Sequence, residues 1–290
     1  MTESLAGLRE RRDFECRLTP SRALESLAEA EEFLRDRGML TRTADSALPS
    51  LYGACHEEPY QQGGVGFASW PATKWSWFGE LTERGHLCLA VHRGKNLLVS
   101  AETATLLDPI CRAETARMRA ADPGWRRLLD HLDATGPADI EDLRFELGLK
   151  RQELKALRYP LERCGVIVAR SAAVTAREGH GHTHTSELYR WDQAYPNATG
   201  PVRDGPAPGD LAQALADLVV AAVRAAVVAP EAEVRRWFSW PWYWPDTMVD
   251  DLVRSGRLRR VDGCVACRPA LGPSRAGLTA LPRARAWMRS

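Results

Sequence analysis

The side chains best suited to contacting a nucleic acid lie on one face of a short helical segment. Arg151, Lys155 and Arg158 stand at positions i, i+4 and i+7, so they share a helix face rotated away from the leucines of the same segment. Gln152 adds a side-chain amide beside them. Arginine and lysine hydrogen-bond guanine edges and phosphate oxygens. The pattern therefore predicts a helix face that contacts DNA, with an ordinary solvated helix face as the alternative.

A second concentration of positive charge lies in the last 40 residues. From Asp251 to the carboxyl end, nine arginines oppose only Asp251 and Asp262. We expect four of them to contact phosphates and residues 273–290 to form a basic tail, with a role in solubility or RNA binding as the alternative. The four are Arg254, Arg257, Arg259 and Arg260.

Tryptophan is the compositional excess of this chain. Seven of the ten tryptophans lie in two short clusters, 70–77 and 237–244. An aromatic face accepts any base, so these residues could form stacking platforms for an unpaired or flipped base. Packing between a helix pair and its wing is the favoured interpretation for most of them. We expect Trp242 and Trp244 to be exposed and to contact DNA.

Other groupings of reactive residues are weaker. On an extended segment the imidazoles of His180, His182 and His184 would lie on one side, where they could bind a metal ion. No acidic or cysteine ligand stands at a matching spacing, and Cys264 and Cys267 form a lone CxxC pair. We therefore expect no metal site and no cofactor. The sequence also lacks a P-loop, a Rossmann glycine pattern and a nucleophilic triad, which argues against kinases, nucleoside triphosphatases and dehydrogenases.

Helical periodicity dominates the elements that must position these residues. Apolar residues recur at helical spacing over 21–37, where Gly38 ends the helix, and again over 73–84 and 101–118. Between the last two, residues 86–100 form two strand-like runs around an Arg-Gly-Lys turn. This segment predicts a β-hairpin.

Residues 123–193 predict a winged helix-turn-helix unit. Three short apolar helices follow one another, and the third is the segment with the cationic face. Two strand-like runs around a polar loop complete the pattern. The next segment, 195–209, holds four prolines and three glycines, which indicates a linker between domains.

The same order of elements recurs on both sides of this central unit. Segment 67–71 (FASWP) resembles 238–241 (FSWP), and 80–87 (ELTERGHL) resembles 251–258 (DLVRSGRL). We infer a mainly α fold with short β-hairpin wings, built from tandem winged helix-turn-helix units. The expected division is an N-terminal unit over 1–118, a central winged helix over 119–194, the linker 195–209, a C-terminal winged helix over 210–272 and the basic tail 273–290.

The composition limits the class of protein. The chain has 290 residues, of which 44% are hydrophobic and 27% charged, enough for two or three small cores. Because 39 Lys and Arg face 38 Asp and Glu, a DNA-binding surface must be local. No stretch is typical of a membrane span or a secretory signal. Seven scattered cysteines indicate a reducing compartment, and we expect a cytoplasmic protein.

Taken together, these motifs resemble a known family. Tandem winged helices with an aromatic W-P…W segment ahead of an [ED]-L-x-x-x-G-x-L helix end are similar to the bacterial AlkZ/YcaQ-type DNA glycosylases, which unhook interstrand crosslinks. The likeness covers most of residues 19–273, and the chain looks like a shorter, divergent relative. The resemblance implies a protein of DNA repair that binds double-stranded DNA.

One departure from the family concerns the catalytic motif. Active members carry Gln-apolar-Asp or Gln-apolar-Gln in the first winged-helix unit, where it positions water at the sugar carbon. This chain has Asp45 and several acids and amides in its first unit, but none with that spacing. Glu57, Glu58 and Gln62 are the positions that we nominate for orienting water. Catalysis therefore does not transfer residue by residue, whereas DNA binding does not depend on that motif.

The sequence thus favours a monomeric protein that binds damaged or distorted double-stranded DNA. An active DNA glycosylase with a diverged water-positioning residue is the first alternative. A winged-helix transcriptional regulator is the second. A regulator usually dimerises to match a palindromic site, so its oligomeric state would distinguish it from a lesion binder.

Overall fold

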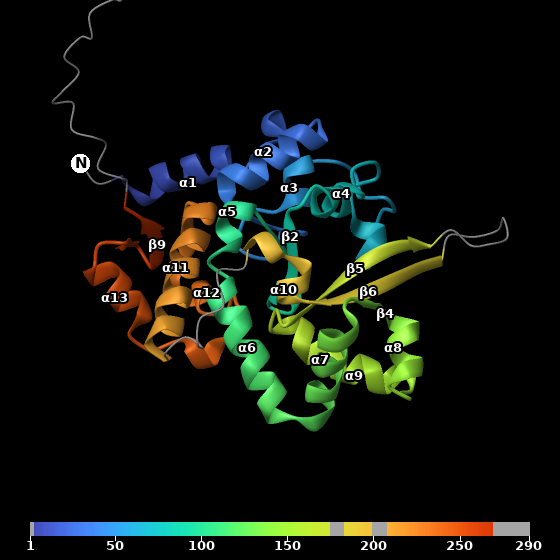
Figure 1. Ribbon diagram of the computed structural model, residues 1–290. Helices are drawn as coiled ribbons and strands as arrows, with labels where there is room; N and C mark the ends of the chain where they lie inside the picture. The colour runs from blue at the N-terminus through green and yellow to red at the C-terminus, as the bar shows by residue number, and fades with distance from the viewer. Residues whose placement is uncertain (1–2, 175–182, 199–207, 269–290) are drawn as a thin grey trace, which may run out of the picture.

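The structure, a computed structural model, describes residues 3–174, 183–198 and 208–268 (Figure 1). Three antiparallel sheets of three strands each organise it, in the orders β1-β3-β2, β4-β6-β5 and β7-β9-β8. In every sheet, the strand that comes last in the chain lies in the middle and pairs with the other two. This threefold topology confirms the mainly α fold of tandem winged helix-turn-helix units that the sequence predicts.

The first unit consists of short helices followed by a hairpin. Its helix α2 is shorter than the predicted segment 21–37, because Ser26 caps its start by accepting from the backbone N–H of Glu29 over 3.2 Å. The predicted helix 73–84 likewise begins only at Trp77. In chain order the elements are η1 (Pro20–Arg22), α2 (Leu27–Arg37), β1 (Met39–Thr41), α3 (Leu51–Cys55), η2 (Gly66–Ser69), α4 (Trp77–Glu83), β2 (Leu87–His92) and β3 (Lys95–Val99).

The predicted helix 101–118 is divided into α5 (Ala101–Ala104) and α6 (Asp108–Ala121). Pro109 stands in the first turn of α6, where its missing N–H costs nothing. The same ring would collide with the preceding turn if one helix ran through it. The proline therefore starts a new helix, and α6 leads from the first unit to the central one.

The central unit has the outline of a winged helix, with three helices and a long hairpin. Its elements are α7 (Pro123–Thr135), β4 (Ala138–Asp139), α8 (Ile140–Glu146), α9 (Arg151–Arg163), β5 (Ile167–Val174), β6 (Thr183–Arg190), α10 (Trp191–Ala194) and η3 (Pro196–Ala198). Buried leucines of α7, α8 and α9 form its own core. The cationic segment identified in the sequence is the third helix, α9.

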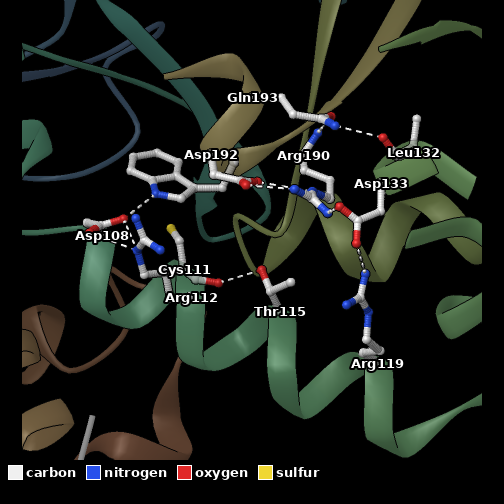
Figure 2. A network of polar contacts seen from close by, with 11 residues as sticks. Asp108, Cys111, Arg112, Thr115, Arg119, Leu132, Asp133, Arg190, Asp192 and Gln193 are labelled. Atoms are coloured by element: carbon white, nitrogen blue, oxygen red, sulfur yellow. Dashed lines mark hydrogen bonds and ion pairs between the residues drawn. The ribbon is translucent and has the colours of Figure 1, made fainter. Parts of the chain in front are cut away.

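A polar network holds α6 against the central unit (Figure 2). The indole of Trp191 donates to Asp108 over 2.8 Å. Asp133 of α7 accepts from Arg119 of α6 over 3.4 Å and also contacts Arg190 at the end of β6. The hydrogen bond from Arg190 is the main reason why the pKa of the Asp133 carboxyl lies below its usual range. These contacts fix the angle at which the central unit leaves α6.

The third unit repeats the topology after the long helix α11. Its elements are α11 (Pro208–Ala226), β7 (Val228–Pro230), α12 (Glu231–Val234), η4 (Pro241–Tyr243), α13 (Met248–Arg254), β8 (Leu258–Val261) and β9 (Cys264–Cys267). The amino-terminal helix α1 (Leu5–Glu15), which the sequence analysis does not predict, packs against this sheet. Leu8 of α1 contacts the core formed by Val228 and Ala266.

Helix α11 is the centre of the largest core. Leu218, Val219 and Val223 are buried in a cluster that also contains residues of the first and third sheets. Figure 1 shows α11 beside α6, with α13 on one side of the molecule and α7 to α9 on the other. Among the described residues, no helix is long and apolar enough to cross a membrane.

Glycines at equivalent places explain the sequence repeat. Gly85, Gly165 and Gly256 each follow the last helix of a unit and have φ angles of 95°, 72° and 74°. Only glycine adopts this left-handed backbone at little cost, and it turns the chain from the helix into the hairpin. The repeated L-x-x-x-G pattern therefore marks the same helix-to-wing turn three times.

Candidate DNA-contacting surface and polar cleft

Helix α9 presents most of its predicted cationic face to solvent. Arg151, Gln152 and Lys155 are exposed, while Leu154 on the opposite face is buried in the core of the central unit. Arg158 is only partly exposed, and its Nε lies 3.3 Å from a carboxylate oxygen of Glu162 one turn later. Two of the three predicted cations are thus fully presented, and the third has an acidic partner within the helix.

The four C-terminal arginines predicted to contact DNA all have partners within the chain. Two contact nearby acids at short range, 2.5 Å for Arg254 to Asp251 and 2.6 Å for Arg257 to Asp217. Arg259 donates to the carbonyl oxygen of Glu3 over 2.8 Å. Arg260 contacts Glu231 and Asp250 at 2.7 and 2.6 Å. The basic tail 273–290 lies outside the described residues. Among the described cations, those of α9 are less neutralised than these four arginines.

The tryptophans divide into buried and half-exposed residues. Trp237 and Trp240 are 0% and 1% exposed, which agrees with a packing role. Trp242 is 49% exposed, and its indole N–H donates to Glu114 over 3.0 Å. Trp244, the other one predicted to contact DNA, is only partly exposed and packs against the main core. Trp75 of the first cluster is 43% exposed, which the sequence did not predict.

The three residues nominated for orienting water have different surroundings. Glu57 lines a cavity of about 410 Å³, accepts from the backbone N–H of Thr73 over 2.6 Å and leaves its second oxygen buried without a described hydrogen-bond partner. Glu58 and Gln62 are exposed and bond each other over 2.5 Å. The structure therefore brings only Glu57 into a cavity.

A second cavity of about 480 Å³ adjoins this one. Both are lined by Thr43 and Ser69, so the two form one polar cleft in the first unit. Asp45, His92 and Lys95 also line the second cavity. Asp45 lies in the loop after β1, and the other two stand opposite each other across the β2–β3 turn. The hairpin and the loop that follows β1 thus position the charged groups of this cleft.

His92 and Asp45 form an incompletely bonded pair inside the cleft. The side chain of His92 is fully buried, and its Nε2 lies 3.9 Å from Asp45 Oδ1, beyond hydrogen-bond distance. Neither ring nitrogen, nor that carboxylate oxygen, has a hydrogen bond of good geometry to a described residue, although the ring also interacts with the backbone of Trp237. Burial lowers the pKa of His92 to about 4, although Asp45 opposes the shift. The imidazole is therefore neutral near pH 7.

The carboxylate of Asp45 is held by a cation on its other side. Lys95 Nζ contacts Asp45 Oδ2, and Arg93 donates to the backbone carbonyl of Asp45 over 3.1 Å. One oxygen of Asp45 is therefore paired, and the other faces His92. A positioned carboxylate of this kind can accept a proton from water or a hydrogen bond from a ligand.

The sequence missed Asp45, His92 and Lys95 as a group. In the sequence Asp45 lies at no motif spacing from a glutamine, and the other two belong to the predicted hairpin 86–100. The hairpin itself contained a usable signal, because residues that flank a two-residue turn are cross-strand neighbours. Their closeness to Asp45 depends on how β1 joins the sheet, which no local pattern shows.

A third hollow lies beside α6 and has a different character. This cavity of about 620 Å³ is lined by four arginines, Arg112, Arg119, Arg126 and Arg190. Arg112, Arg119 and Arg190 contact aspartates of the network in Figure 2. Most of its positive charge is thus committed to holding the units together.

In the part of the chain that the structure describes, no three His, Cys, Asp or Glu side chains lie together so that they could hold a metal ion. Cys264 and Cys267 stand three positions apart on β9, so their side chains point to opposite faces of the strand and cannot chelate one ion. His180 and His182 lie outside the described residues. His184 is paired through its backbone with Ala173 in the hairpin.

The chain matches no protein-family model and no curated protein. Its structure is similar to the solved structure of the Streptomyces sahachiroi DNA glycosylase AlkZ, with a TM-score of 0.53 and 14% sequence identity. The superposition covers 92% of this chain and 70% of that one. The three winged-helix units described above therefore adopt, over nearly their whole length, the fold of AlkZ.

Proposed function

We propose that the protein binds double-stranded DNA through its winged-helix units, with α9 in the major groove, and that it acts in DNA repair on damaged or distorted duplex. The observation that carries the proposal is the position of Arg151 and Lys155, exposed side by side on the third helix of a winged helix. That helix is the one that contacts base edges in such units. The fold shared with a DNA glycosylase supports a role in repair.

The cellular setting and the oligomeric state belong to the same proposal. All seven cysteines are free thiols, which supports a reducing cytoplasm. Three units within one chain provide several surfaces for DNA, so a single copy can contact a distorted duplex without a partner. A monomer that binds a lesion is thereby favoured over a dimeric regulator.

Equilibrium binding to a labelled duplex tests the proposal. We expect Arg151→Ala combined with Lys155→Ala to weaken binding about tenfold or more, because it removes two contacts to base edges or phosphates. Arg35→Ala is the matched control, since Arg35 is an exposed helix cation of the first unit paired with Glu31. Equal affinity of wild type, double variant and control would contradict the proposal.

The regulator alternative makes a different prediction. A regulator would elute as a dimer and protect a palindromic site in a footprint. The proposed lesion binder elutes as a monomer. In footprints on duplexes of random sequence, the segments that it protects share no common sequence. A dimer with a palindromic footprint would replace the repair function with a regulatory one.

A DNA glycosylase is the second candidate function, and the polar cleft favours it. In such a reaction Asp45 would accept a proton from water while the water oxygen bonds to the sugar C1′. The C1′–N bond breaks, and the damaged base leaves with the bonding electrons. Incubation with alkylated duplex, followed by detection of abasic sites, tests this candidate. We expect product from the wild type and none from Asp45→Asn; no product from the wild type with any alkylated duplex would exclude it.

A further inference from the structure

A cluster of exposed aromatic rings lies at the surface of the first unit. Tyr60, Phe67 and Trp75, here called the aromatic patch, are 60%, 44% and 43% exposed. The ring centroid of Phe67 lies 5.4 Å from those of both Tyr60 and Trp75. Three adjoining exposed aromatic residues are uncommon on a soluble surface and usually mark a binding site.

The loop that carries the patch is tied down rather than loose. The N–H of Tyr60 donates to the carbonyl of Trp70 over 2.7 Å, and that of Gln61 donates to Ala68 over 2.9 Å. The hydroxyl of Tyr52 donates to the carbonyl of Trp75 over 2.5 Å. The rings are therefore held in place before any ligand arrives, which reduces the entropy lost on binding.

The patch is continuous with the polar cleft. Trp70 lines the cleft, and its ring centroid lies 5.1 Å from that of Phe67. Asp45, Lys95 and Asn96 line the same cleft and provide acceptors and donors of hydrogen bonds. The stacking surface and the polar groups thus meet where two loops adjoin the β2–β3 hairpin.

We propose that the aromatic patch and the cleft together hold a single unpaired nucleobase of DNA. The base stacks on Phe67, contacts Trp75, whose ring is inclined at 71° to that of Phe67, and directs its polar edge toward Asp45 and Asn96. This inference rests on the proposed DNA binding, and it adds that the first unit binds an unpaired base of the DNA. A nucleobase fits because it has two apolar faces and a polar edge, as the site does.

The chemistry of the site argues against other occupants. An apolar protein surface would bury the ion pair of Asp45 and Lys95 and leave the second oxygen of Asp45 without a polar partner. A paired base within a duplex has both faces covered by its neighbours, so it cannot stack on Phe67. An unpaired base satisfies both halves of the site.

Competition between two duplexes tests the inference. One duplex is fully matched, and the other has the same length and one unpaired 2-aminopurine, whose fluorescence falls when it stacks. We expect the wild type to prefer the second about tenfold and to quench the probe. Phe67→Ala and Trp75→Ala should each remove most of the preference and leave affinity for the matched duplex unchanged.

Two further variants separate stacking from folding. Phe67→Tyr keeps an aromatic face and should keep the preference. Phe14→Ala removes a ring on α1 that is 57% exposed, more than the 44% of Phe67, and should also keep the preference. Loss of the preference in Phe14→Ala would overturn the inference.

The outcomes distinguish this inference from the function on which it rests. Equal wild-type affinity for both duplexes, with binding still dependent on Arg151 and Lys155, overturns the unpaired-base site and leaves the proposed function standing. Absence of DNA binding overturns both. A wild-type dimer that Trp75→Ala converts to a monomer would show that the patch is an interface between copies, and would also overturn the inference.

Discussion

Tyr243 donates its phenolic hydrogen to Glu114 over 2.7 Å, and this bond ties the third unit to helix α6. Trp242 donates to the same oxygen over 3.0 Å, and the guanidinium of Arg117 contacts both carboxylate oxygens at 2.9 and 2.7 Å. Glu114 has no exposed surface, so these donors compensate its charge in place of water. The contact also places Arg117 4.6 Å from the ring centroid of the half-exposed Trp242.

Glu114→Ala should lower the free energy of unfolding by about 3 kcal/mol, because it removes a buried acceptor shared by three side chains from two units. Glu141→Ala is the control, since the side chain of Glu141 is 60% exposed and pairs with Arg144 of its own helix; its effect should stay below about 0.5 kcal/mol. Urea denaturation with comparison of m-values measures both. Equal stability of the two variants would show that the contact does not join the units.

The buried imidazole of His92 should make stability depend on pH. Its pKa is about 4 in the folded protein and about 6.5 in an unfolded chain. Below pH 6.5 the unfolded chain takes up a proton that the folded protein does not, so stability is complete above pH 6.5 and falls toward pH 4. The loss is about 3 kcal/mol at most. His92→Gln should lose less over this range; parallel curves for wild type and variant would contradict the assignment.

The repeated glycines allow a matched comparison of one substitution at two places. Gly85→Ala should cost about 1 kcal/mol, because the site has φ of 95° but no atom within 4 Å of an added Cβ. Gly165→Ala should cost about 3 kcal/mol, since its Cβ would lie 2.9 Å from the sulfur of Cys111 and 3.3 Å from Val91. Thermal and urea unfolding measure the difference. A larger loss for Gly85→Ala would contradict the claim that crowding by Cys111 and Val91 sets the cost at Gly165.

Local patterns predict most of the helices, the hairpins and the repeat, but neither α1 nor the break between α5 and α6. The L-x-x-x-G pattern ends a helix wherever it occurs, because the backbone requirement at Gly85 and Gly256 is local. The cationic face of α9 was predictable for the same reason, since helical spacing alone places Arg151 and Lys155 on one side. Packing of distant segments was not: α1 lies against the third sheet, which its own sequence does not indicate.

Long-range contacts also decide which charged residues are available to bind a ligand. Arg259 belongs to a basic run in the sequence, yet in the structure it donates to Glu3 at the other end of the chain. Asp45 and His92 are 47 positions apart and meet only because β1 joins the β2–β3 hairpin. The candidate cleft could therefore be identified only from the fold, whereas the candidate DNA-contacting helix could be identified from the sequence.

The salt dependence of DNA binding tests the central claim most directly. Each phosphate that a cation neutralises releases condensed counterions, so the slope of log affinity against log salt counts the phosphates neutralised by the protein. With one duplex over a range of salt concentrations, the slope of the variant lacking Arg151 and Lys155 should be shallower than that of the wild type by about two units. Parallel lines for the two proteins would contradict DNA binding through α9.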